Sequence, residues 1–476
     1  MNIFFFGAGK LGRYWLEQWR SFGIEPEGIF DNNESLWGLM CDGVMVYSPD
    51  MIGEFDFNYI FITCRNEREI IKQLSGLKIP GNSIISGSHN ILNHMLYCAV
   101  KKMVTANFET EYHDCVIDRM VLFDLQNGMV LGGVETWSFD LAKRLKKKGR
   151  QGVYLSAGPV GGGVRDDTYP VQAFMLQRIE KQKDKIDLCI KKILENLPCT
   201  VICNFPQHIF WAACIAKQQF PKLVRIIAVQ HNDELIYYET YCLWQEYIDR
   251  CMAISSAIEQ KLLSFGMEKN KIGRLEWSIF CKEKVNRRWS RENMCLQIGY
   301  AGRVTVIQKR IDLFVPLARR LKRKDVQFRI NIAGTGDYSE TLQEKIKEGG
   351  FQDCMVCTGY IERKDIPDFW SRQDLMVSCS EYEGHSISQS EAMAEGAVPV
   401  ITDVSGARDD VTDGYNGYVV AVGDIDALAD RIQELYLDRD KLEQMGRRAH
   451  DTICERQKTM DQGAFWDDLI EKVWEQ

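Results

Sequence analysis

Two glutamates, Glu383 and Glu391, carry the clearest chemical signal in the chain, because the seven residues between them include the start of a helix. Ser386 followed by Gln389 fits a capping box, and Ala392 opens a run of good helix formers. Glu383 is therefore predicted in the loop before the helix, and Glu391 a little more than one turn inside it. The unpaired N–H groups at the start of that helix attract phosphate. With one carboxylate facing a sugar and the other a ribose, the arrangement suits a nucleotide-sugar.

The segments around this pair favour a binding site over a capped surface helix, which is the commoner explanation for two glutamates at this spacing. Residues 375–380 are predicted as a buried strand that leads into the loop. Gly396 would end the helix, and residues 397–401 would form the next strand. Strand, loop, capped helix and strand make a parallel α/β unit, in which ligands bind beyond the carboxyl ends of the strands.

The segment from Ser380 to Gly396 resembles the donor-site signature of retaining glycosyltransferases of family 4, usually Ser-x-x-Glu-Gly-Phe through Glu-Ala-Met-Ala-x-Gly. His385 stands where the family usually has Phe. The resemblance runs from about Val121 to the C-terminus and implies a GT-B fold of two Rossmann-like lobes. It also implies transfer of a sugar from a UDP- or GDP-sugar to a hydroxyl of a glycan or lipid-linked acceptor, with retention of the anomeric configuration. Bacterial surface polysaccharide or glycoconjugate synthesis is the setting that it suggests.

The resemblance also implies roles for individual residues. Arg303 and Lys309 would stabilise the leaving diphosphate, and Glu383 would orient the sugar. His231, at the end of a strand of the first lobe, would lie near the reacting sugar or the acceptor. The remaining substrate contacts, from phosphate turns to base and ribose, are expected at Gly132, Gly133, Gly302, Tyr360, Ile361, Gly384, His385, Ser386, Ile387 and Glu391.

Without the resemblance, these signals have plainer explanations. The consecutive glycines Gly132 and Gly133 could form only a tight turn. Arg303 and Lys309 could belong to a solvated loop, and a single histidine such as His231 usually lies in the core or on the surface. No Asp-x-Asp pattern stands in a suitable context, so neither a metal nor another cofactor is expected to be required for catalysis.

A separate nucleotide-binding pattern opens the chain. Residues 3–6 are predicted as a strand, and Gly7, Gly9 and Gly12 form the Gly-x-Gly-x-x-Gly turn. Asp31 ends a second strand nineteen positions after Gly12, where a ribose-binding carboxylate is expected. The pattern resembles small nucleotide-binding modules at the front of several bacterial polysaccharide enzymes. A bound nucleotide and a scaffold used for docking or assembly both remain open.

The predicted fold class is therefore α/β, a two-lobed GT-B architecture preceded by a third, small Rossmann-like domain. The final helix could cross back to the first lobe, as in relatives. The expected parts are a nucleotide-binding module at 1–95, a helical linker at 96–119, an acceptor lobe at 120–288, a donor lobe at 289–462 and a C-terminal helix at 463–476.

Composition restricts the class of protein further. The net charge of -8, without a basic tail, argues against nucleic acid as a partner. No stretch approaches the roughly 20 apolar residues of a membrane span, and no signal peptide is evident. A cytoplasmic location is therefore expected, with all 16 Cys as reduced thiols. The basic cluster at 143–150 is explained by the helix dipole, with peripheral contact to anionic lipid as the alternative.

Two other classes of function stay open. A nicotinamide-dependent oxidoreductase could be built on the turn from Gly7 to Gly12, but no catalytic constellation follows within that module. A non-catalytic nucleotide- or glycan-binding scaffold is disfavoured, because Arg303, Lys309 and both glutamates are all present.

Overall fold

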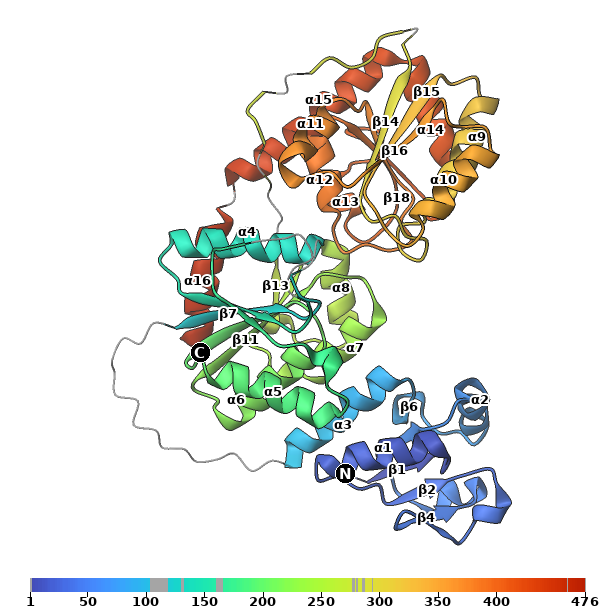
Figure 1. The fold of residues 1–476 in the computed structure, drawn as a ribbon, viewed down its shortest axis with the longest axis vertical. Coiled ribbons are helices and arrows are strands. Elements are labelled where there is room, and N and C mark those ends of the chain that lie inside the picture. Colours follow the sequence, from blue (N-terminus) through green and yellow to red (C-terminus); the bar gives the residue numbers. More distant parts are fainter. Residues whose placement is uncertain are drawn as a thin grey trace. The chain divides into compact units, whose positions relative to one another are not determined.

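The chain forms three β-sheets with associated helices, one after another along the sequence (Figure 1). It has two compact units, one of Met1–Ala228 with Tyr238–Arg250 and the other of Val229–Tyr237 with Cys251–Gln476. The predicted α/β class is confirmed, whereas the exact domain bounds stay a prediction. The computed structural model describes residues 2–102, 119–129, 132–159, 166–275, 279, 281–284, 287–292, 294–459 and 461–475.

The first sheet has the strand order β3-β4-β2-β1-β5-β6 and is parallel except for the β3–β4 pair. Its central strand is the predicted Phe-rich run, which is buried on both faces as expected for a parallel strand. Helices α1 (Lys10–Ser21) and α2 (Glu67–Gly76) belong to this module. The strands are β1 Ile3–Phe6, β2 Gly28–Phe30, β3 Met40–Cys41, β4 Val44–Tyr47, β5 Tyr59–Ile62 and β6 Ile84–Ile85.

Helix α3 (Ser88–Lys102) follows this sheet and is a core element rather than a simple connection. Its buried Asn93 accepts hydrogen bonds from two indole nitrogens, Trp211 Nε1 at 2.9 Å and Trp244 Nε1 at 2.7 Å. The predicted linker 96–119 therefore begins inside a buried helix, and its residues 103–118 lie outside the described part of the chain. A polar residue at the centre of the buried face weakens the apolar periodicity, which is why a linker was predicted here.

The second sheet has the order β13-β12-β11-β10-β7-β8-β9. The strand predicted to end before His231 is confirmed as β11, which ends at Gln230. The strands are β7 Met120–Leu125, β8 Gly152–Ser156, β9 Val171–Ala173, β10 Cys199–Cys203, β11 Val224–Gln230, β12 Arg250–Ala253 and β13 Ile272–Arg274. The helices are α4 Gly133–Lys147, α5 Gln182–Leu194, α6 His208–Gln219, α7 Leu235–Leu243 and α8 Ser256–Ser264.

The third sheet is parallel throughout, in the order β16-β15-β14-β17-β18-β19. Strand order reverses between β14 and β17, and the ends of such neighbouring strands form a crevice in which ligands bind. The strands are β14 Leu296–Ala301, β15 Phe328–Ala333, β16 Met355–Gly359, β17 Leu375–Ser378, β18 Val398–Thr402 and β19 Tyr418–Val420. The helices are α9 Phe314–Arg323, α10 Ser339–Glu348, α11 Ile366–Ser371, α12 Ile387–Ala394, α13 Ala407–Asp410, α14 Ile425–Leu437, α15 Arg439–Thr459 and α16 Gln462–Trp474.

Two cysteines correct a prediction from composition. Cys281 and Cys454 form a disulfide that joins the segment before the third sheet to α15. The expectation of 16 reduced thiols is therefore wrong for this pair. A separation of 173 residues along the chain leaves no spacing pattern by which the sequence could reveal it. Among the helices that the structure describes, none is long and apolar enough to cross a membrane.

Candidate active site

Two loops at the reversal of strand order carry the predicted charged residues. Arg303 and Lys309 follow β14, and Glu383 follows β17, the neighbouring strand. The carboxyl ends of parallel strands meet at one edge of a sheet. The topology of the sheet thus brings Arg303, Lys309 and Glu383 to the same edge, although Arg303 and Glu383 are 80 positions apart in the sequence.

Glu383 is the centre of a polar cluster and its side chain is only 9% exposed. Its Oε1 accepts from Lys309 Nζ at 2.5 Å and from Ser380 Oγ at 2.8 Å. Its Oε2 accepts from Gln308 Nε2 at 3.3 Å, and Gln308 Oε1 in turn accepts from Arg303 Nη2 at 2.5 Å. The carboxylate is therefore held in one orientation, while Lys309 keeps further N–H donors for an anion.

Close backbone contacts fix the turn that carries Arg303. A Cβ on Gly334, which has φ +130°, would lie 1.9 Å from the carbonyl oxygen of Gly302. Tyr300 Oη donates to the carbonyl oxygen of Arg303 at 2.6 Å. These contacts pack the loops after β14 and β15 against each other, so the Arg303 side chain, which is exposed, extends from a fixed backbone.

The start of α12 offers free backbone donors beside this cluster. The predicted cap is confirmed, since Ser386 Oγ accepts from the Gln389 N–H at 3.3 Å. The return bond of the capping box is replaced, because Gln389 Nε2 donates to Ala407 O at 3.5 Å. Within the described residues, the N–H groups of Ile387 and Ser388 have no hydrogen-bond partner. Such groups at a helix N-terminus can bind a phosphate.

His385 is tied to a buried carboxylate that the sequence did not indicate. Its Nε2 lies 3.1 Å from Ser390 Oγ and 3.4 Å from Asp410 Oδ2. Ser390 Oγ donates to Asp410 Oδ2 at 2.9 Å, and the Arg456 guanidinium pairs with the other carboxylate oxygen. The contact depends on how α13 packs beside α12, so no local motif could have revealed Asp410.

Three further predicted contacts come from α12 and from the segment that follows β16. Glu391 lies inside α12, where burial raises the pKa of its carboxyl to about 7, partly opposed by the positive charge of Arg363. Tyr360, directly after β16, is 52% exposed and thus open to a ligand. Ile361 packs against the apolar cluster that contains Trp370, so it is a weaker candidate for a base contact.

His231 follows β11 and lies against the loop that carries Glu383 and Gly384. A Cβ on Gly384 would come within 2.1 Å of the His231 carbonyl oxygen, so only glycine fits at position 384. Burial lowers the pKa of the His231 imidazole to about 3, and the ring is therefore neutral near pH 7. A neutral ring can hydrogen-bond to a sugar or an acceptor but supplies no positive charge.

Gly132 and Gly133 lie in the first compact unit, at the start of α4. Gly132 is the N-cap residue, and a Cβ there would lie 2.3 Å from Glu135 Oε2. The buried carboxylate of Glu135 thus stands close to the turn. Residues 130 and 131, which complete the predicted turn, lie outside the described residues.

In the N-terminal module, Asp31 hydrogen-bonds to the backbone of the glycine turn. Asp31 Oδ2 accepts from the Ala8 N–H at 2.7 Å, and Asp31 Oδ1 accepts from the Asn33 N–H at 2.8 Å. A Cβ on Gly12 would lie 2.0 Å from the Gly7 carbonyl oxygen, so helix and turn approach too closely for a side chain. Gly9 is the N-cap of α1 and provides no side-chain cap. Asp31 therefore supports the turn, while the start of α1 stays open.

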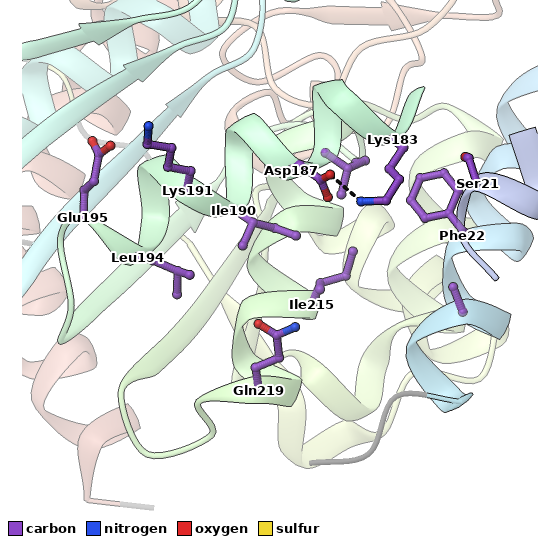
Figure 2. Close-up of a pocket in the computed structure, with 12 residues that line it drawn as sticks. Ser21, Phe22, Lys183, Asp187, Ile190, Lys191, Leu194, Glu195, Ile215 and Gln219 are labelled. Atoms are coloured by element: carbon purple, nitrogen blue, oxygen red, sulfur yellow. Dashed lines mark hydrogen bonds and ion pairs between the residues drawn. The ribbon is translucent and has the colours of Figure 1, made fainter. Parts of the chain in front are cut away.

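A separate cavity of about 670 Å³ lies in the first compact unit (Figure 2). Phe22, from the end of α1, faces apolar side chains of α5 and α6 across it, and the ion pair of Lys183 with Asp187 lies at its edge. Its lining, taken from the described residues, includes none of the predicted site residues. The cavity is mainly apolar and differs in chemistry from the charged cluster at Glu383.

The two Rossmann-like sheets, with a charged cluster at the strand reversal of the second, define the GT-B fold. The solved structure of HepE from Anabaena with UDP-glucose has a TM-score of 0.61 at 17% identity, covering 75% of this chain and 100% of that chain. The structure of a TarM mutant from S. aureus with UDP and saccharide ligands has a TM-score of 0.53 at 15% identity, with 100% of both chains covered.

Family models match two segments of the chain. Residues 283–452 match the model described as glycosyl transferases group 1. Residues 1–85 match a model described as C2185-like, N-terminal. The predicted resemblance to group 1 glycosyltransferases is thus confirmed over residues 283–452, and the extra N-terminal domain is confirmed as well.

Curated relatives match over part of their length. The poly(ribitol-phosphate) alpha-N-acetylglucosaminyltransferase of Staphylococcus aureus is 30% identical over 165 residues, which is 34% of this chain and 32% of that protein. The putative colanic acid biosynthesis glycosyltransferase WcaL of Salmonella typhimurium is 26% identical over 215 residues, 44% of this chain and 52% of that protein. The chain therefore spans about a third to a half of the length of the curated relatives that it matches.

Proposed function

We propose that the chain is a retaining glycosyltransferase that moves a sugar from a nucleoside-diphosphate sugar to a hydroxyl of a glycan or lipid-linked acceptor. Bacterial surface polysaccharide or glycoconjugate synthesis is the proposed setting, in the cytoplasm and without a catalytic metal. The observation that carries the proposal is the cluster of Lys309, Glu383 and the open start of α12, inside the domain that matches group 1 glycosyltransferases.

The cluster has the chemistry that a departing nucleoside diphosphate needs. Negative charge builds on the diphosphate as the bond to the sugar breaks, and fixed donors stabilise it. Lys309, Arg303 and the N–H groups of Ile387 and Ser388 provide such donors. Glu383, oriented by three donors of its own, can accept from sugar hydroxyls.

A UDP-sugar is the first donor to test. The HepE structure holds UDP-glucose and the TarM structure holds UDP, both on the same fold as this chain. The group 1 match also favours a transferase over the oxidoreductase that the N-terminal turn alone would allow.

The proposal is tested by incubating the full chain with UDP-glucose, UDP-galactose, UDP-N-acetylglucosamine and GDP-mannose. Binding is followed by thermal shift, since a ligand that binds only the folded state raises the melting temperature. Turnover is followed by release of UDP or GDP, with and without EDTA. We expect one donor to bind and turn over in EDTA, and NMR of the product to show the donor's anomeric configuration. An inverted product would overturn retention, and turnover restored only by manganese or magnesium would overturn the metal-free proposal.

A second proposal concerns the N-terminal module, where we propose a nucleotide site at the start of α1. The support is the uncapped Gly9 and the absence of any acid in the first turn of that helix. A Cβ at Gly9 would meet nothing within 4 Å, and Asp is a favourable N-cap, so the fold should persist in Gly9→Asp. Its negative charge should abolish binding of a nucleotide to the module and leave donor turnover unchanged. A nucleotide stoichiometry that is the same in wild type and Gly9→Asp would contradict this site.

A further inference from the structure

His385 has one ring nitrogen that the protein leaves unused. Among the described residues, its Nδ1 is buried and has no hydrogen-bond partner. The residue lies between Glu383, the proposed sugar-orienting carboxylate, and Ser386, the cap of α12. An unsatisfied polar atom in such a loop indicates a partner that is bound only when the site is occupied.

The neighbours of His385 decide which hydrogen-bonding role Nδ1 has. Ser390 has a single hydroxyl hydrogen and donates it to Asp410 Oδ2 at 2.9 Å. At 3.1 Å from His385 Nε2, Ser390 Oγ is therefore the acceptor, and Nε2 carries the ring hydrogen. In the neutral ring Nδ1 then holds a lone pair and is an acceptor.

The carboxylate behind the ring is itself held in place. The Asp410 side chain is fully buried, and the Arg456 guanidinium donates to its Oδ1. The backbone carbonyl of Asp410 accepts from Asn416 Nδ2 at 2.9 Å. Asp410 and Ser390 thus keep the ring in one tautomer and one orientation.

We propose that His385 determines which donor sugar is accepted, because its Nδ1 accepts a hydrogen bond from one sugar hydroxyl. Asp410 and Ser390 act as positioning residues that hold the ring with Nδ1 as acceptor. A hydroxyl is the matching partner, since it supplies the donor that this nitrogen lacks. Phe, which the resemblance leads one to expect at this position, has no such acceptor. The inference rests on the proposed function.

The test compares the wild-type chain and His385→Phe on the best donor of the panel and on its 2-, 3-, 4- and 6-deoxy analogues. For one analogue we expect the wild-type kcat/KM to fall about tenfold, the size of one neutral hydrogen bond. In His385→Phe the same deletion should change kcat/KM less than twofold, because the hydrogen bond is already absent. Deletion of the other hydroxyls should affect both proteins equally.

Two further variants distinguish direct contact of His385 with the sugar from positioning of its ring by Ser390. His385→Asn keeps a polar atom near the position of Nδ1, and we expect it to recover part of the discrimination that His385→Phe loses. Ser390→Ala removes the acceptor that fixes the tautomer, so it should weaken discrimination between the analogues with little change in kcat. UDP alone lacks the sugar, and its unchanged affinity in all variants would show that each is folded.

The outcomes separate this assignment from the proposed function. If deletion of each hydroxyl lowers kcat/KM equally in wild type and His385→Phe, Nδ1 does not contact the sugar, while the transferase assignment would stand. Failure of the wild-type chain to turn over any nucleotide-sugar of the panel would overturn the proposed function and this assignment with it.

Discussion

Lys309 and Glu383 form an ion pair in the loops at the strand reversal of the third sheet. Each is largely shielded from solvent, and their opposite charges offset each other, which leaves Arg303 as the net positive charge of the cluster. The sequence could predict Arg303, Lys309 and Glu383 through its resemblance to family 4 glycosyltransferases, and all three lie in loops that follow apolar strands. It could not predict Asp410, whose contact with Ser390 depends on the packing of two helices.

Lys309→Ala is expected to lower turnover of the preferred donor by about tenfold to a hundredfold, because the departing diphosphate loses a fixed cation. The change also leaves the buried Glu383 with only Ser380 and Gln308 as donors. Arg303→Ala should also lower turnover, and because Arg303 does not contact Glu383 directly, the comparison separates loss of a cation from loss of a Glu383 donor. Steady-state kinetics measure both, and an unchanged kcat in Lys309→Ala would remove this lysine from the reaction.

Glu391 gives a pH dependence whose sign follows from its pKa of about 7, raised from 4.5 by burial. In the free protein the carboxyl gains a proton as pH falls through about 7, and an ionised carboxylate is the better acceptor for a ribose hydroxyl. UDP affinity is therefore expected to strengthen between pH 6 and pH 8. The same shift means that Glu391 destabilises the fold as pH rises from about 4.5 to about 7, because the folded state holds the proton more tightly.

Calorimetric titration of UDP at several pH values checks this expectation, with Glu391→Gln as the control. The variant cannot ionise, so its affinity should be weaker and nearly independent of pH. A wild-type affinity that is flat across this range would place Glu391 away from the nucleotide.

At the scale of elements, strands and their turns were predictable from apolar runs that end at glycine, and the capped helix α12 from its Ser386 signal. The burial of helix α3 was not, because it depends on two distant tryptophans that donate to Asn93. Its buried face also explains why the first sheet and most of the second lie in one compact unit.

Truncation tests the role of α3. A chain that starts at residue 86 keeps the helix, whereas one that starts at residue 118 loses it and leaves the indole N–H groups of Trp211 and Trp244 unpaired. Each unpaired buried donor costs about 1–3 kcal/mol, in addition to the apolar surface that is exposed. We expect the longer chain to melt cooperatively and to turn over donor, and the shorter one to melt at a lower temperature or to aggregate. Equal melting temperatures would show that α3 is only a connection.

At the scale of the whole chain, the order of the three α/β parts along the sequence could be predicted, because each opens with a strand, a glycine turn and a helix. A covalent link between Cys281 and Cys454 could not, since neither residue stands in a motif. The disulfide closes a loop of 173 residues within the second compact unit. A cross-link of this kind stabilises mainly by restricting the unfolded chain.

Reduction is therefore expected to lower the thermal midpoint of the full chain, by an amount that corresponds to about 2–4 kcal/mol. Cys281→Ser should have the same effect without reductant, because it removes one sulfur of the bond. Cys295→Ser is the matched control, since Cys295 is an exposed free thiol near the same sheet. Mass spectrometry of alkylated peptides shows the bond directly. If Cys281 and Cys454 are both alkylated in the unreduced protein, or if Cys281→Ser melts like Cys295→Ser, the pair does not cross-link the second unit.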